Sequence, residues 1–315
     1  MQNIEPIVVI LGTGGTIAGT ADQAADNVGY TAAQLGVQQL IAQVPALAAL
    51  PLEAEQLSQI DSKDMGFAVW RTLAQRVAFH LARAEVAGVV VTHGTDTLEE
   101  TAFFLQRVLA PAKPVVLTAA MRPATALLAD GPQNLVDAIA VARAEGAGGV
   151  VAVIGGEVHS GLDLRKVHTY SLAAFSSGDA GVIAQVEEGR LRQHRPWPTG
   201  AALGLARLPD DVSTWPRVEI VTSHAGAGAA IVQALCGIGV DGIVAACTGN
   251  GSVHHELEAA LLEAQAADVR VVRSSRCLNG AVIDASAPAL PSAGALTPVQ
   301  ARVELMLALI EQRPA

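Results

Sequence analysis

The sequence predicts an α/β protein with two domains, each built on a parallel sheet that helices cover on both faces. Short runs rich in Val and Ile alternate along the chain with longer Ala-, Leu- and Glu-rich stretches of helical periodicity. The apolar runs end in Gly, Thr, Ser or Asn, as buried parallel strands do where they lead into loops. The alternation stops between residues 187 and 216, where Pro, Arg and Trp accumulate.

The expected elements follow from these patterns in chain order. The apolar runs predict strands at 7–11, 88–92, 114–118, 150–155, 218–222, 242–246 and 269–273. The periodic stretches predict helices at 65–84, 97–109, 134–145, 228–237 and 255–266. We therefore expect an N-terminal α/β domain over residues 1–190, a linker over 191–214 and a smaller C-terminal α/β domain over 215–315.

Composition excludes several classes of partner. The 315 residues are 51% hydrophobic but only 3% aromatic, so Ala, Val, Leu and Ile must form the core. The mean hydropathy of +0.38 is high, yet no apolar run approaches the roughly 20 residues of a membrane span. Many buried strands and a large subunit interface would account for the high mean hydropathy. The net charge of −10 disfavours nucleic-acid binding.

The three cysteines, Cys236, Cys247 and Cys277, are too few for a disulfide framework and predict reduced thiols. The first residues lack the basic segment of a secretory signal. A cytoplasmic location is therefore expected, and a periplasmic one stays open if a leader peptide has been removed before residue 1.

A glycine-rich segment, residues 12–19, directly follows the first predicted strand. Its glycines allow backbone N–H groups to approach a ligand closely. It lacks the third glycine of a dinucleotide loop and the lysine of a P-loop, so nucleotide binding is disfavoured. Two readings remain: a tight turn after the strand, or a loop in which Thr16 serves as a hydroxyl nucleophile.

A second polar segment, residues 92–101, follows another predicted strand. Since ligands bind at the carboxyl ends of parallel strands, this segment and the Thr16 segment are expected to face one cleft. Asp96 has the chemistry to bind a substrate ammonium group. The alternative is helix capping by Asp96 or Thr97, with Glu99 or Glu100 in the first turn. His93, at the end of a buried strand, is interpreted as a packed residue rather than a base.

Two further residues have competing interpretations. Ser62 could donate to a carboxylate, but its sequence context favours an N-cap for the following helix. Lys166 is one of three lysines in a chain that otherwise uses arginine, and a lysine, unlike an arginine, can lose its proton when buried. The segments 120–123, 129–135 and 248–252 are interpreted as turns, and lining a pocket stays open as the alternative for each. No Cys or His cluster has metal spacing, so neither a metal nor another cofactor is expected.

Taken together, these motifs resemble the bacterial-type L-asparaginase family, which includes asparaginase–glutaminases. The resemblance covers nearly the whole chain and rests on residues 14–19, 92–97 with 99–102, 120–123, 129–132, 248–251 and 272–276. It implies a flavodoxin-like parallel-sheet N-terminal domain plus a smaller α/β domain, and a tetramer built from dimers. It also implies hydrolysis of L-asparagine to L-aspartate and ammonia, with possible secondary glutaminase activity.

The resemblance assigns roles residue by residue. It implies that Thr16 is the nucleophile, that Lys166 and Asp96 polarise Thr95, and that Tyr30 belongs to a mobile loop that closes over substrate. Ser62 matches the residue that binds the α-carboxylate, and Asp96 also binds the α-ammonium group. The implied substrate contacts are Gly15, Ser62, Lys63, Gly94, Thr95, Asp96 and Asn250, the last reaching a neighbouring subunit's site.

The sequence departs from the family at two positions. Lys63 stands where the family often has Gln, and no clear Glu follows the Arg-Ser-Ser-Arg segment, although Asp284 could replace it. Three other functions stay open as alternatives. They are an ammonia-releasing amidotransferase subunit, a binding protein that has lost catalysis, and a nicotinamide or flavin enzyme.

Overall fold

The computed structural model describes residues 5–286 and 288–313. They form two compact units, the first ending at Leu205 and the second beginning at Ala206. The segment expected to be a linker, 191–214, lies on both sides of this boundary. It contains most of strand β10 (Arg190–Gln193) and two short 3-10 helices, Leu205–Arg207 and Val212–Thr214.

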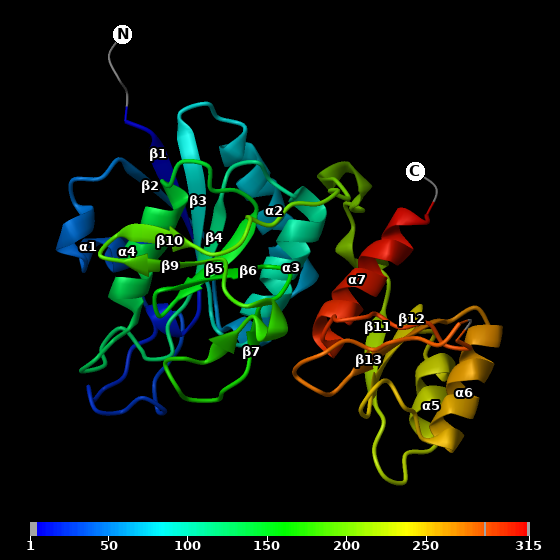
Figure 1. Cartoon of the computed structure of the whole chain (residues 1–315). Helices are drawn as coiled ribbons and strands as arrows, with labels where there is room; N and C mark the ends of the chain where they lie inside the picture. The colour runs from blue at the N-terminus through cyan, green and yellow to red at the C-terminus, as the bar shows by residue number, and fades with distance from the viewer. Residues whose placement is uncertain (1–4, 287, 314–315) are drawn as a thin grey trace. The chain divides into compact units, whose positions relative to one another are not determined.

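The first unit contains an eight-stranded sheet whose order is β10-β9-β6-β5-β4-β3-β1-β2 (Figure 1). The five strands from β5 to β2 are parallel, and β6, β9 and β10 extend the sheet in antiparallel pairs. Besides β10, the strands are β1 (Ile7–Gly14), β2 (Leu52–Ile60), β3 (Val86–Thr92), β4 (Val115–Thr118), β5 (Val150–Ile154), β6 (Glu157–Ser160) and β9 (Ala184–Glu187).

Four helices cover the two faces of this sheet (Figure 1). They are α1 (Val37–Ala42), α2 (Phe67–Leu81), α3 (Leu98–Leu109) and α4 (Gly131–Ala142). Val8, Ile10 and Val90 pack with Leu135 and Ile139 of α4, and this cluster also includes residues of α1. The intervening strand residues face α2 and α3, because successive side chains of a strand alternate between faces. Burial on both faces explains why the strands appear in the sequence as continuous apolar runs.

The order of strands in the sheet reverses direction at β1. The chain leaves β1 toward β2 on one side, whereas β3, β4 and β5 follow on the other side. Consequently α1 and α3 lie on opposite faces of the sheet. Such a reversal of strand order is where open α/β sheets bind ligands. The loops that follow β1 and β3 are those that contain Thr16 and Thr95.

The second unit is a smaller α/β layer structure. Three parallel strands, in the order β11-β12-β13, pack against α5 and α6 on one face and α7 on the other (Figure 1). The elements are β11 (Val218–Thr222), α5 (Ala230–Gly237), β12 (Gly242–Cys247), α6 (His255–Ala266), β13 (Arg270–Ser275) and α7 (Pro298–Glu311). No helix of the described residues has the length and apolarity needed to cross a membrane.

A separate two-stranded sheet completes the first unit. It consists of β7 (Arg165–Lys166) and β8 (Phe175–Ser176), which pair with each other and with no strand of the main sheet. The position of Lys166 is therefore not set by the main ladder of backbone hydrogen bonds.

The predicted fold class is confirmed, and the seven predicted strands and five predicted helices are all present. The sequence patterns missed β2, because this edge strand is half-exposed and contains polar residues instead of a Val/Ile run. They also missed α7, although Thr297 and Gln300 form a capping box at its start. Helix α4 begins three residues earlier than expected, with Pro132 in its first turn.

The packing of α2 against α3 yields a first prediction. Phe104 is fully buried and stacks on Trp70, with ring centroids 4.8 Å apart. Phe104→Ala removes this contact and leaves a cavity, so we expect it to lower the free energy of unfolding by about 3–5 kcal/mol in denaturant titrations. The matched change Phe104→Leu refills most of the volume and should cost about 1 kcal/mol. Equal losses for the two variants would contradict this account.

Candidate active site

Two glycines bring the loops after β1 and β3 into direct backbone contact. A Cβ atom added to Gly15 would lie 2.3 Å from the Cα of Gly94, and one added to Gly94 would lie 2.3 Å from Ser62 Oγ. Gly15 also has a φ of +81°, which disfavours any residue with a side chain. Thr16 and Thr95 immediately follow the two glycines in the chain. The glycine contact therefore holds both threonines at one end of the sheet.

Thr16 begins a short 3-10 helix, Thr16–Ala18, and is buried. Its Oγ1 lies 2.7 Å from the hydroxyl of Tyr30, close enough for a hydrogen bond in which either group could donate. The Tyr30 loop returns to the Thr16 segment through a backbone bridge between Thr20 and Thr31. The structure thus places Tyr30 directly over the hydroxyl that the sequence singled out.

The loop that carries Tyr30 is also joined to the segment after β4. The amide of Ala124 donates to the Gly19 carbonyl (2.9 Å), and the amide of Ala21 donates to Thr125 Oγ1 (2.9 Å). A carboxylate orders the second segment, because Asp130 accepts the amides of Met121 and Arg122. The segments 120–123 and 129–132, interpreted as turns, therefore support the loop over Thr16.

The second threonine is part of a charged triad. Lys166 Nζ donates to Thr95 Oγ1 at 2.9 Å and to Asp96 Oδ1 at 2.7 Å. The side chain of Lys166 is 19% exposed and that of Asp96 is 52% exposed, so Asp96 faces solvent and can reach a ligand. The structure brings together Thr95, Asp96 and Lys166 across about 70 residues of sequence. No group of three or more potential metal-binding side chains occurs in the described part of the chain.

The capping interpretation of Ser62 is wrong. The next α-helix begins at Phe67 and is preceded by Gly66, while Asp61 caps the intervening 3-10 turn. Ser62 Oγ instead accepts the amide of Asp96 at 3.1 Å. A serine hydroxyl that accepts one hydrogen bond still has its own hydrogen to donate, so Ser62 can bind an anion.

The capping interpretation of Asp96 and Thr97 also needs correction. Thr97 does occupy the N-cap position of α3, but its side chain makes no capping bond. Its hydroxyl donates to the Ser62 carbonyl at 2.8 Å, and the Asp96 carboxylate is bonded to Lys166. Both side chains are thus used to join segments that are far apart in sequence.

His93 is a packed residue, as expected. It is fully buried, and burial lowers its pKa to about 4, so the ring is neutral. Trp70 donates to Thr101 Oγ1 (2.8 Å), which leaves the threonine hydrogen to bond His93 Nε2 (3.0 Å). The remaining proton, on Nδ1, is donated to the Gly94 carbonyl at 2.7 Å. This relay anchors Gly94 to the interior of α2 and α3.

Three other predicted site residues are bonded locally. Lys63 is exposed and pairs with Asp61 (2.6 Å) and Asp64 (3.3 Å). In the second unit, the Asn250 amide exchanges two hydrogen bonds with the backbone of Ile283. The carboxylate of Asp284 pairs with Arg273 and accepts from Ser292. The carboxylate of Asp284 is thus bonded within its own unit.

Sequence reasoning did not assign Glu99 to the site. Its Oε2 accepts the backbone amide of Lys166 at 2.8 Å, and burial raises the pKa of its carboxyl to about 7. Glu99 lies in the first turn of α3, close to Asp96. Acidic residues are common at this position because they interact favourably with the helix dipole, so the sequence alone did not mark Glu99 as a site residue. Only the fold reveals that β7 lies against this turn.

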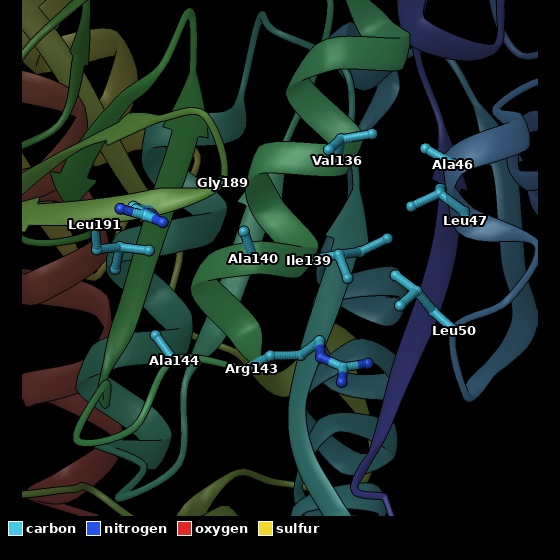
Figure 2. A pocket seen from close by; sticks show the side chains of 11 residues that line it. Ala46, Leu47, Leu50, Val136, Ile139, Ala140, Arg143, Ala144, Gly189 and Leu191 are labelled. Atoms are coloured by element: carbon cyan, nitrogen blue, oxygen red, sulfur yellow. The ribbon is translucent and has the colours of Figure 1, made fainter.

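A hollow of about 600 Å³ lies elsewhere in the first unit, beside α4 (Figure 2). Val136, Ile139 and Ala140 project into it from α4, with Leu47 and Leu50 on the far side. Its lining contains no hydroxyl or carboxylate group, so it lacks the chemistry of the Thr16 and Thr95 loops.

Comparisons with known proteins agree with this geometry. The N-terminal asparaginase family model matches residues 7–199, and the glutaminase/asparaginase C-terminal domain model matches 217–314. L-asparaginase 2 of Escherichia coli K12 is 38% identical over 98% of this chain and 90% of its own length. Glutaminase-asparaginase of Pseudomonas fluorescens is 37% identical over 96% and 86%.

A solved structure described as "Probable Cytoplasmic L-asparaginase" from Campylobacter jejuni superposes with a TM-score of 0.91. It is 37% identical, and the match covers 96% of this chain and 95% of that one. The chain therefore belongs to the asparaginase family of amidohydrolases.

The glycine contact yields a second prediction. Gly15→Ala places a methyl group against the Gly94 backbone, which has no side-chain rotamer to move aside. Together with the strained φ, this should cost about 3 kcal/mol or more of unfolding free energy. Gly66→Ala is the matched control because its Cβ would meet open space, and it should cost at most about 1 kcal/mol. Similar losses for both variants would show that the Gly15–Gly94 contact is not tight.

Proposed function

We propose that this member of the asparaginase family hydrolyses the side-chain amide of L-asparagine through an acyl-enzyme on Thr16, with secondary activity on L-glutamine. The observation that carries the proposal is the pairing of two polarised threonines at the switch point of the sheet. Thr16 lies under the Tyr30 hydroxyl, and Thr95 accepts a hydrogen bond from Lys166. Amide hydrolysis needs a nucleophile, a proton route and a site for the oxyanion.

The substrate's α-amino and α-carboxylate groups have complementary partners in the site. Asp96 uses Oδ1 for Lys166, which leaves its exposed second oxygen for an ammonium group. Ser62 keeps a hydroxyl hydrogen that can be donated to a carboxylate. Because the Ser62 hydroxyl accepts the Asp96 amide, the two groups are held next to each other, as the two charges of an α-amino acid require.

In the first step, Thr16 Oγ1 attacks the amide carbon and forms an ester. The C–N bond breaks, and the proton of the Thr16 hydroxyl passes to the nitrogen, which leaves as ammonia. The amide of Gly15 already donates to the Ile60 carbonyl (2.9 Å), so it is not available to the oxyanion. We assign that role to the amides of Thr16 and Thr95, for which the described residues provide no acceptor. One such donor is worth roughly 3–4 kcal/mol in other acyl-transfer enzymes.

In the second step, water attacks the β-aspartyl ester and releases aspartate from Thr16. As the ester bond breaks, one proton of this water returns to Thr16 Oγ1, and either the Tyr30 hydroxyl or the Thr95–Lys166 pair can relay it. Lys166 also stabilises negative charge that develops on Thr95, since its ammonium group lies 2.9 Å from that hydroxyl. The ion pair with Asp96 holds the Lys166 ammonium group in place.

Assembly and location extend the proposal. We infer a homotetramer or dimer in which Asn250 of the second unit contributes to a site that subunits share, as the family resemblance implies. A cytoplasmic location is supported by three free cysteines, one of them buried, and by the Campylobacter jejuni protein's description. An amidotransferase subunit remains the alternative, and it predicts that the chain alone releases no ammonia.

The third prediction tests the nucleophile. Ammonia release from L-asparagine and L-glutamine is measured for the wild type and for Thr16→Ala at equal protein concentration. We expect asparagine turnover in the wild type and a loss of about 10³-fold or more in the variant, because the proposal assigns the ester to the Thr16 hydroxyl. Thr16→Ser, which keeps a hydroxyl, should retain measurable turnover. Full activity in Thr16→Ala, or none in the wild type, would overturn the proposal.

A fourth prediction concerns Lys166. Lys166→Met keeps most of the side-chain volume but removes the ammonium group that polarises Thr95, so kcat should fall about 100-fold or more with a smaller change in KM. Lys113→Met is the matched control, since the Lys113 ammonium group bonds the Arg83 carbonyl instead. A Lys166→Met enzyme with unchanged kcat would remove the Thr95–Lys166 pair from the mechanism.

A further inference from the structure

A carboxylic acid with no part in the proposed chemistry lies directly behind the charged triad. Glu99 is the second residue of α3, and its side chain is partly buried. Its Oε2 accepts the backbone amide of Lys166 at 2.8 Å. The ammonium group of the same lysine reaches Thr95 and Asp96, which lie just before the helix.

Lys166 is thus held at both ends by one short stretch of chain, residues 95–99. This clamp matters because β7 has only two residues and pairs with β8 alone. The Lys166 amide points to Glu99 rather than into a sheet ladder. The chain before Lys166 is tied to β6 through the amide of Leu164, which donates to the Ser160 carbonyl, and the Glu99 bond adds a direct link from the Lys166 backbone to the start of α3.

We propose that Glu99 is a positioning residue for the amidase reaction, which holds Lys166 in register with Thr95 and Asp96 through its bond to the Lys166 amide. This inference rests on the proposed function, since it acts through the Thr95–Lys166 pair. It adds a residue whose carboxyl group touches neither substrate nor reacting atoms.

The charged groups around Glu99 make the clamp sensitive to pH. Burial is the main cause that raises its pKa to about 7, and the neighbouring charge of Glu100 adds to the effect. On β7, the Lys166 amide and the positive charges of Arg165 and Lys166 act in the opposite direction. Arg165 Nε is buried and has no hydrogen-bond partner among the described residues.

The direction of the pH dependence follows from the charge of the Glu99 carboxyl group, which accepts the Lys166 amide. Above pH 7 Glu99 is ionised and makes a charge-assisted bond to the Lys166 amide, which is stronger than a bond to the neutral acid. Below pH 7 the acid is protonated and the clamp weakens. The kcat of the wild type should therefore fall by about threefold as the pH drops from 8 to 6.

The test compares kcat and KM for L-asparagine from pH 5.5 to 8.5 in wild type, Glu99→Gln and Glu99→Ala. Glu99→Gln keeps a neutral acceptor, so it should lose the inflection near pH 7 and stay near the wild-type value at pH 6. Glu99→Ala removes the acceptor, and we expect at least about a tenfold loss of kcat with less than about a threefold change in KM. Glu145→Gln, which removes an exposed carboxylate in the turn after α4, should keep the wild-type profile.

A second readout separates this inference from the proposed function. The amide resonance of Lys166, followed by NMR, should titrate with a midpoint near pH 7 in the wild type and lose that transition in Glu99→Gln. This holds whether or not asparagine is the substrate. An unchanged pH profile in Glu99→Gln, or a Lys166 amide that does not titrate in the wild type, would overturn the role of Glu99. Absence of ammonia release from the wild type alone would overturn only the amidase.

Discussion

The candidate active site depends on the approach of two backbones at Gly15 and Gly94. A Cβ atom at either position would overlap atoms of the neighbouring segment, so only glycine allows the loops after β1 and β3 to touch. The contact lies where the strand order reverses, and it places two threonines at the same end of the sheet. Tyr30 and Lys166, which come from other segments of the chain, can then each reach one of the two threonines with a direct hydrogen bond.

The interior of the first unit holds this contact in place. Gly94 is bonded through His93 and Thr101 to Trp70, which in turn stacks on Phe104 in the core between α2 and α3. A neutral, fully buried imidazole suits this role because it can accept from one side and donate to the other without carrying charge. The packing of α2 against α3 therefore helps to fix the position of Gly94.

Much of the fold could be predicted from local pattern, whereas much of the site could not. Strands buried on both faces leave apolar runs, and glycine and threonine mark their ends, so both threonine loops could be assigned to one edge of the sheet. The partners within that edge are set by contacts between distant segments. Ser62 resembles a capping residue in its local sequence, and only the fold shows that its hydroxyl accepts the Asp96 amide. Glu99 likewise resembles an ordinary first-turn acid until β7 is placed beside it.

The scarcity of lysine has a consequence for covalent labelling of this protein. Among the three lysines, Lys166 is largely covered and Lys113 is partly covered, while the Lys63 side chain is 61% exposed on the turn that also contains Ser62. Reagents that acylate amines would therefore react with Lys63 before the other two lysines, close to the candidate substrate site. Hydrogen bonds to Asp61 and Asp64 raise the pKa of that amine, which slows its acylation near neutrality. The exposed thiol of Cys277 in the second unit offers a separate attachment point for thiol-selective reagents.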